Sequence, residues 1–297
     1  MHQETTTLVH VWWYALSAIA VVNLGIWTFS TRSFLRPRSG ADVIAHRWPH
    51  VLLSAGYVLG CAFRSVLPRA DVQRIVVYDS WLSSVLVGRS VATIAELCFA
   101  AQWALLLREL SRDQEHPIGD LLSRVVLPLI VLAEVFSWYA VLTTSYLGNT
   151  LEQSLWTSTV ILLVVALFPL WRKAEGALRS FLTTSLVLSV CFVAFMCLVD
   201  VPMYFTRWLA DEAAGRTYLT LAQGLHDVST RWVVTHDLRE WREEIAWMTL
   251  YFSFAVWFSI AMVHTPRALR RQALALSHAS TQVRGRHSSP ELGAPAE

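Results

Sequence analysis

Charged side chains are scarce in this chain. Only 15% of its 297 residues are Asp, Glu, Lys or Arg, whereas 55% are hydrophobic, and the mean hydropathy is +0.44. A soluble domain of this length needs more charge to cover its surface. The scarcity therefore argues against a soluble protein. The net charge of +2 also lacks the strong positive excess that is typical of nucleic-acid binding.

Lysine and cysteine are also rare. Lys173 is the only lysine, and the four cysteines, Cys61, Cys98, Cys191 and Cys197, all fall inside apolar stretches. No CxxC motif is present, which leaves no sequence evidence for a cysteine metal site or a disulfide framework. Thiols in such surroundings are typical small packing residues.

Seven long apolar stretches predict a polytopic membrane protein. A helix needs about 20 apolar residues to cross the hydrocarbon core of a bilayer. The expected fold is therefore all-α, a bundle of seven transmembrane helices, of which the second is the weakest because Arg64 shortens it. The predicted spans cover residues 8–30, 49–67, 81–107, 122–145, 154–171, 179–205 and 245–264.

Arginine is concentrated in the loops after the first, third and fifth spans and in the C-terminal tail. Cytoplasmic loops are enriched in basic residues, so we expect the N-terminus outside and the C-terminus in the cytoplasm of a cell-membrane protein. Residues 1–266 are expected to form one transmembrane domain, with an extracytoplasmic loop and surface helix at about 206–244. The basic tail 267–297 has little apolar content and is expected to be disordered.

Four ionisable residues interrupt the apolar stretches: Arg89, Glu96, Glu134 and Asp200. A charge inside a bilayer is energetically costly, so such residues usually face the protein interior and mark functional sites. The rise of an α-helix places all four in the outer half of the membrane or near its midplane. Arg89 lies at a depth between the acids, and we expect it to pair with Asp200 or Glu134.

These four residues are the candidate catalytic residues. Buried carboxyl groups beside an arginine can act as general acid and base, or can carry a proton. Trp103, Trp138 and Tyr204 share helix faces with the charges and are expected to line the same cavity. The alternative interpretation is a structural network of ion pairs that fixes how the helices pack.

A weaker pattern precedes the last span. His236, Glu240 and Glu243 follow one another at helical spacing, and imidazole and carboxylate groups at one-turn intervals can bind a divalent metal. The alternative is a solvated amphipathic segment at the membrane surface, with Arg239 and Glu243 as an ion pair. Asp237 is expected to cap a helix that runs into the last span.

Seven spans with an external N-terminus resemble the topology of rhodopsins. Retinal proteins hold their chromophore on a lysine of the last span, but here that span, TLYFSFAVWFSIAMV, contains none. A retinal Schiff base is therefore excluded. Haem b needs paired histidines within the spans, which the sequence also lacks. The cofactor is unknown, and a divalent metal has only weak support.

Three classes of function fit these features. The interpretation that we favour from the sequence is a membrane-embedded enzyme that uses carboxylate acid and base chemistry on a lipid-like or small apolar substrate. The alternatives are a proton- or ion-coupled transporter or channel, and a non-catalytic sensor or scaffold.

The polar residues crowd into the outer half, and no polar trail is evident beyond Gln102. Gln102 and Asn23 are expected to form hydrogen bonds between helices. The expected partners are the bilayer and a lipid-like molecule or ion, with no nucleic acid.

Overall fold

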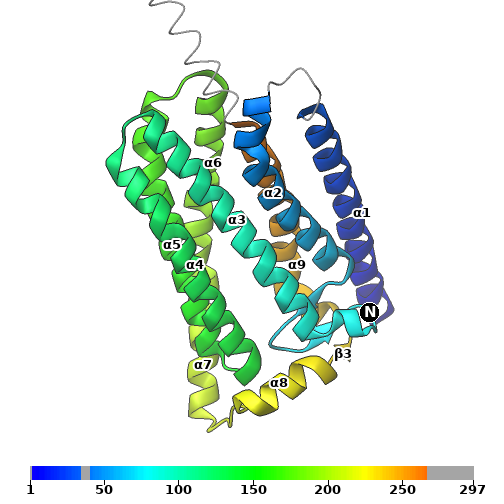
Figure 1. Cartoon of the computed structure of the whole chain (residues 1–297). Helices are drawn as coiled ribbons and strands as arrows, with labels where there is room; N and C mark the ends of the chain where they lie inside the picture. Colours follow the sequence, from blue (N-terminus) through cyan, green and yellow to red (C-terminus); the bar gives the residue numbers. More distant parts are fainter. Residues whose placement is uncertain (1, 35–40, 266–297) are drawn as a thin grey trace, which may run out of the picture.

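The computed structural model of the chain is a bundle of long helices with a small cap at one end (Figure 1). It describes residues 2–34 and 41–265, with side chains for 6–32 and 47–265. Within these ranges, six helices are long and apolar enough to cross a membrane. The expected apolar helical bundle of a membrane protein is therefore found. The predicted tail 267–297 lies outside the described residues.

Successive long helices run in alternating directions along the bundle axis. The six with membrane-spanning character are α1, α3, α4, α5, the continuous helix of α6 and α7, and the helix that α9 begins and that ends at Thr265. Their bounds, with that of α2, are α1 His2–Phe34, α2 Ala41–Val66, α3 Val85–Asp113, α4 Pro117–Thr143, α5 Tyr146–Lys173, α6 Gly176–Phe195, α7 Val201–Ala213 and α9 Leu238–Leu250.

Helix α2 is the predicted span that is not among these six. It carries Arg47, His50 and Arg64 along its length and Pro49 inside it. These residues lower its hydropathy, and all three basic side chains are buried. The helix itself exists where the second span was expected, but its composition is more polar than that of the others.

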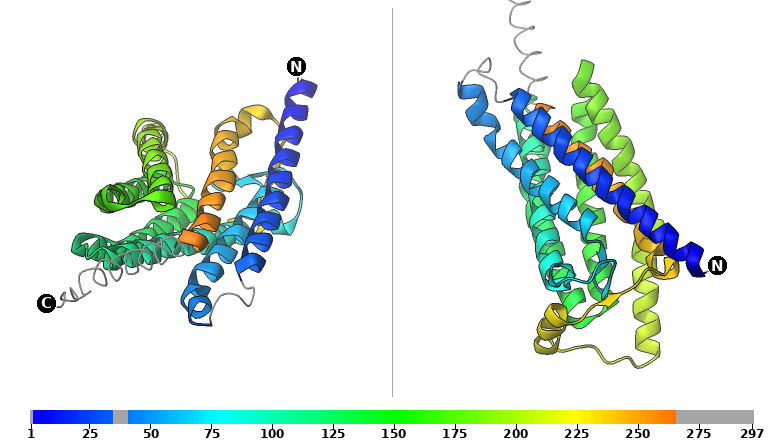
Figure 2. Two further views of the ribbon diagram at one scale, coloured as in Figure 1. Left: turned by 90° about the horizontal axis from the view of Figure 1, so that it is seen from above. Right: turned by 90° about the vertical axis from the view of Figure 1, so that its right-hand side faces the viewer.

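Helix α3 lies between two groups of helices, as the view along the bundle shows (Figure 2). On one side α3 packs against α2, which contacts α1; on the other it packs against α4, which contacts α5. Small residues bring these helices close together. A β-carbon at Gly60 of α2 would lie 2.6 Å from that of Ala95 in α3, and one at Gly148 would lie 2.7 Å from that of Ala140. Such small residues are typical of helix contacts in membranes.

Two of the helices contain a π-helical turn. The turn Met196–Asp200 (η2) joins α6 to α7, and the turn Tyr251–Ala255 (η3) follows α9. Asn23 of α1 donates a hydrogen bond from Nδ2 to the carbonyl of Phe252 at 2.8 Å, within the second turn. The expected interhelical hydrogen bonding of Asn23 is thus present. π-Helical turns of this kind are frequent at functional sites.

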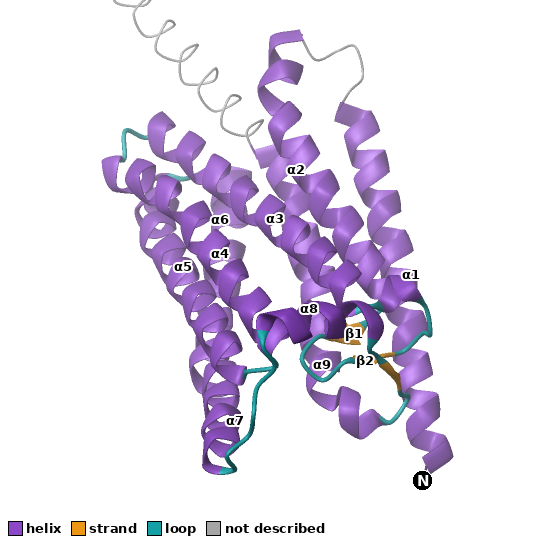
Figure 3. Ribbon diagram, turned by 60° about the horizontal axis from the view of Figure 1, so that its bottom comes forward, coloured by secondary structure: helices purple, strands orange, loops and turns teal. Residues whose placement is uncertain are grey.

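A cap that the sequence did not predict covers the end of the bundle where the chain begins (Figure 3). Strands β1 (Arg69–Ala70) and β2 (Ile75–Val76) pair antiparallel, and β3 (Val233–Val234) joins β2 in parallel. The 3₁₀ turn η1 (Trp81–Ser83) and helix α8 (Leu221–Thr230) complete it. Gly224 of α8 is needed at this position, because its β-carbon would lie 2.0 Å from the carbonyl oxygen of Leu142.

The predicted loop 206–244 is more structured than expected. Helix α7 continues to Ala213, and α8 is a separate short helix that lies across the end of the bundle. Helix α9 begins at Leu238, and the side chain of Asp237 accepts a hydrogen bond from the backbone N–H of Arg239 at 3.0 Å. The prediction that Asp237 is the N-cap residue of this helix is therefore confirmed.

Candidate functional site

Arg89 is the centre of a buried group of charged side chains. Its Nη2 atom donates to Oε2 of Glu134 at 2.8 Å and to Oε2 of Glu96 at 3.3 Å. Its Nη1 atom lies 3.8 Å from Oε1 of Glu152. Arg89, Glu96 and Glu134 are each less than a tenth exposed. The predicted partnership of Arg89 with Glu134 is therefore present, and Glu96 joins it.

Asp71 extends this group into the cap. It follows β1, and its carboxylate lies 2.8 Å from Nε of Arg69, 3.9 Å from Nη1 of Arg89 and 4.0 Å from Nη2 of Arg64. Burial by itself would raise the pKa of Asp71, but the guanidinium groups outweigh it and hold the pKa below its ordinary value. We call the whole set the charge cluster, which comprises Arg64, Arg69, Asp71, Arg89, Glu96, Glu134 and Glu152.

The two carboxylate oxygens of Glu134 have different hydrogen-bond partners. Oε2 receives hydrogen bonds from Arg89 and, at 2.6 Å, from the hydroxyl of Thr93, which in turn receives one from Nε1 of Trp138 at 3.1 Å. Oε1 is buried and has no hydrogen-bond partner among the described side chains and backbone. A buried acceptor in this state is costly unless a neighbouring group can donate to it.

Glu96 is the neighbouring group that can donate. Its carboxyl group and that of Glu134 meet the same nitrogen of Arg89. A carboxyl group that retains its proton can donate to a facing carboxylate oxygen. The pair can therefore hold one proton between its two members.

Glu152 was missed by the sequence analysis, as was Asp71. The predicted fifth span starts at 154, whereas α5 starts at Tyr146, so that Glu152 lies almost two turns inside the helix. Asn149 donates to its Oε2 at 3.4 Å. The signal that could have identified Glu152 is the mixture of apolar and polar residues just before residue 154. Helical periodicity in that segment could have extended the predicted span backward to include Glu152. Asp71 gave no such signal, because it lies in a loop.

Asp200 does not join the charge cluster. It ends the π-helical turn between α6 and α7, and it forms no ion pair with any described residue. Tyr204, one turn further on, stacks on Tyr146 of α5 with ring centroids 6.1 Å apart. Asp200 and Tyr204 therefore lie on the α7 side of the bundle, whereas Arg89 is held by α3, α4 and α5.

The two tryptophans expected to line the cavity lie in different places. Trp138 donates a hydrogen bond to Thr93, which in turn donates to Glu134 of the charge cluster. Trp103 packs instead in an aromatic group with Phe99, Phe181 and Phe258, at centroid distances of 6.2 to 6.4 Å. Trp103 is part of an apolar core that lies further along α3 than Glu96. Its ring adjoins no described carboxylate.

The three residues of the possible metal site have separate partners. His236 donates from Nε2 to the carbonyl of Val77 at 3.0 Å and stacks on His10, with centroids 4.4 Å apart. Glu243 pairs with Arg207, and Glu240 is exposed. Among the described residues, no group of three or more metal-binding side chains converges.

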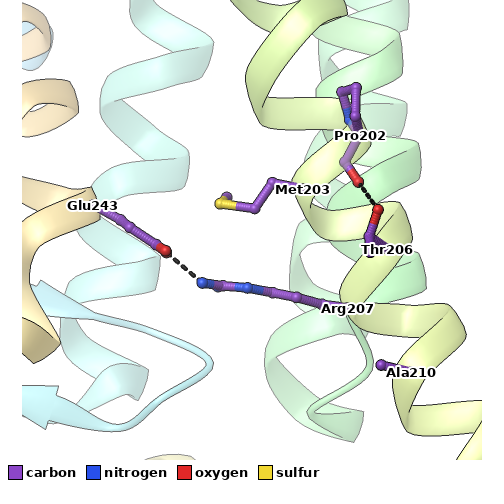
Figure 4. Close-up of a pocket in the computed structure, with 6 residues that line it drawn as sticks. All are labelled: Pro202, Met203, Thr206, Arg207, Ala210 and Glu243. Atoms are coloured by element: carbon purple, nitrogen blue, oxygen red, sulfur yellow. Dashed lines mark hydrogen bonds and ion pairs between the residues drawn. The ribbon is translucent and has the colours of Figure 1, made fainter.

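A hollow of about 420 Å³ opens between α7 and the start of α9 (Figure 4). Met203 extends into the space between the two helices, and Arg207 reaches across it to form an ion pair with Glu243. Pro202, Thr206 and Ala210 complete the lining on α7. At the opposite end, Phe181 of α6 contacts Phe258, with centroids 5.9 Å apart. All six residues that line the hollow lie in α7 or α9.

No protein-family model, curated protein or solved structure matches the chain.

Proposed function

We propose that the protein is a multi-pass membrane protein that binds and releases a proton at Glu96 and Glu134, as the coupling site of a proton-dependent transporter. The observation that carries the proposal is the shared nitrogen of Arg89 together with the unpartnered Oε1 atom of Glu134. A carboxyl pair with one proton satisfies this arrangement, and intramembrane carboxyl groups are the usual proton carriers of transporters.

The balance of charge supports the same conclusion. The charge cluster contains three guanidinium groups and four carboxyl groups. An uncompensated carboxylate in a buried place is strongly unfavourable, so one carboxyl group is expected to hold a proton. Glu96 is the natural holder, because Glu134 receives two good hydrogen bonds and Glu96 receives one long one.

This proposal takes α2 as a seventh span, with the N-terminus outside and the C-terminus in the cytoplasm of the cell membrane. The arginine distribution supports that orientation. The charge cluster and the cap would then face the outside, and a proton would enter from there.

Infrared difference spectroscopy of the purified chain tests the proton site. The wild type should show the C=O stretch of a protonated buried carboxyl group at neutral pH, and Glu96→Gln should lack it. Glu96→Gln keeps a donor facing Glu134, so the variant should fold with an unchanged melting temperature. A spectrum with the same carboxyl band in wild type and variant would overturn the proposal. Glu115→Gln, which changes a carboxyl group outside the charge cluster, is the matched control.

A membrane-embedded enzyme is the second candidate, and the hollow between α7 and α9 favours it. Its apolar lining with one ion pair suits a lipid-like molecule that enters from the side of the membrane. Cells that make the wild type should then differ in lipid profile from cells that make Glu134→Gln. Identical profiles would count against this candidate.

A further inference from the structure

Polar side chains continue along α3 beyond the charge cluster. Gln102 and Glu109 follow Arg89 and Glu96 along the helix, at intervals of six or seven residues. At 1.5 Å per residue, the distance from Arg89 to Glu109 is about 30 Å, which equals the thickness of the hydrocarbon core. The sequence indicated no polar trail beyond Gln102, whereas Glu109 continues it on α3 and other helices supply further polar groups.

Gln102 joins α3 to two of those helices. Its Nε2 atom donates to the carbonyl of Ser259 at 2.9 Å, and its Oε1 atom accepts from the hydroxyl of Ser259 at 2.7 Å. The Ser259 hydroxyl also lies 3.1 Å from that of Ser54 in α2. Gln102, Ser54 and Ser259 are completely buried. Three polar groups from three helices thus meet in the apolar interior.

His50 connects this group to the other end of the bundle. It lies one turn before Ser54 on α2 and is completely buried. Its Nε2 atom is 3.1 Å from Oε1 of Glu109, a partly exposed residue near the end of α3. Its Nδ1 atom is buried and has no hydrogen-bond partner among the described residues. An imidazole with one free nitrogen and one bonded nitrogen can accept a proton on the first and release one from the second.

Two tyrosines fill the interval between Glu96 and Gln102. Tyr57 of α2 stacks on Phe99, which lies midway between them on α3, with centroids 4.4 Å apart. Tyr251, the first residue of the second π-helical turn, meets Tyr57 edge-on, with ring centroids 5.9 Å apart. Both hydroxyls are buried, and neither has a hydrogen-bond partner among the described residues.

We propose that these groups form a proton path from the charge cluster to the opposite end of the bundle. We call it the polar file, which comprises Glu96, Tyr251, Tyr57, Ser259, Ser54, His50 and Glu109. The inference rests on the proposed proton site and adds the transported ion, H⁺, and its route. Each hydroxyl accepts a proton on its oxygen and passes on its own. His50 accepts one at Nδ1 and releases the Nε2 proton to Glu109, so no electron changes place.

Proton flux into liposomes tests the polar file. The full chain is reconstituted in vesicles of phosphatidylcholine and phosphatidylglycerol that contain a pH-sensitive dye, and a potassium gradient with valinomycin supplies the potential. Wild type should move protons faster than empty vesicles. Ser259→Ala and Tyr251→Phe should each reduce the flux at least ten-fold. Ser158→Ala and Tyr139→Phe remove the same groups from outward-facing positions and should leave it unchanged.

His50→Gln separates a relay from a structural role. Glutamine keeps a donor for Glu109 but cannot take up a proton and release another, so its flux should fall to that of empty vesicles while the melting temperature stays unchanged. Glu96→Gln is measured beside it. Loss of flux in Glu96→Gln, with wild-type flux in His50→Gln, Ser259→Ala and Tyr251→Phe, would overturn the polar file and leave the proton site standing. Wild-type vesicles that move no more protons than empty ones would overturn the polar file, whereas the infrared measurement decides the proton site.

Discussion

Gly88 and Arg69 occupy adjoining space so tightly that a β-carbon at Gly88 would lie 1.0 Å from Nη2 of Arg69. The missing side chain lets the fully buried guanidinium group lie against the first turns of α3, where its Nη1 atom donates to the carbonyl of Ser84 at 2.7 Å. Arg69 in turn holds Asp71, so this contact connects the cap to the charge cluster.

Gly88→Ala should therefore displace Arg69 and destabilise the cap. Overpacking at a closely packed site costs about 1–3 kcal/mol, which outweighs the gain in helix propensity of about 1 kcal/mol. The melting temperature in detergent should fall by several degrees. Gly25→Ala is the control, because nothing lies within 4 Å of its β-carbon position. Equal melting temperatures for the two variants would contradict the expected clash.

Arg89→Ala should be the most damaging single change in the charge cluster. It removes the common partner of Glu96, Glu134 and Glu152 and leaves buried carboxylates uncompensated. Removal of one partner of a buried pair costs about 3–5 kcal/mol, measured here by denaturation in detergent. Arg124→Ala breaks an exposed pair with Asp120 and should cost less than about 1 kcal/mol. A similar small loss for Arg89→Ala would show that the charges do not depend on it.

Acid should weaken the cap through Asp71. The pKa of Asp71 is held below its ordinary value, so the stability that it contributes is complete above the unfolded pKa of about 4. It is lost as the pH falls below that value towards the lowered folded pKa. The melting temperature of wild type should therefore decline below about pH 4 more steeply than that of Asp71→Asn. Parallel curves for the two proteins would contradict this assignment.

Asp227→Asn should loosen the attachment of α8. Oδ2 of Asp227 lies 2.8 Å from Nε of Arg74, a buried side chain whose Nη2 atom also donates to the carbonyl of Val141 at 2.6 Å. The variant leaves Arg74 without its counter-charge, and limited proteolysis should cut the cap at least several-fold faster. Asp211→Asn, which weakens an exposed pair with Arg216, is the control and should be cut at the wild-type rate.

The apolar helices and the buried charges were predictable because a bilayer imposes a simple rule on sequence. About 20 apolar residues are needed for each crossing, and an ionisable residue within them must face the protein. Arg89, Glu96 and Glu134 were identified on that basis and lie together in the structure. The prediction that Arg89 could also pair with Asp200 came from their similar depths, which describe position along the membrane normal alone. It contained no information on which helices are neighbours.

The sequence by itself determined that the chain is an apolar helical protein with charges in its interior, since composition and helical period depend on local residues. Only the tertiary structure decided that Glu152 and Asp71 complete the charge cluster, that a small sheet covers it, and that His50 and Ser259 continue it. These contacts join residues that are far apart in the chain. They depend on helix packing through small residues such as Gly60 and Gly88, which no single segment specifies.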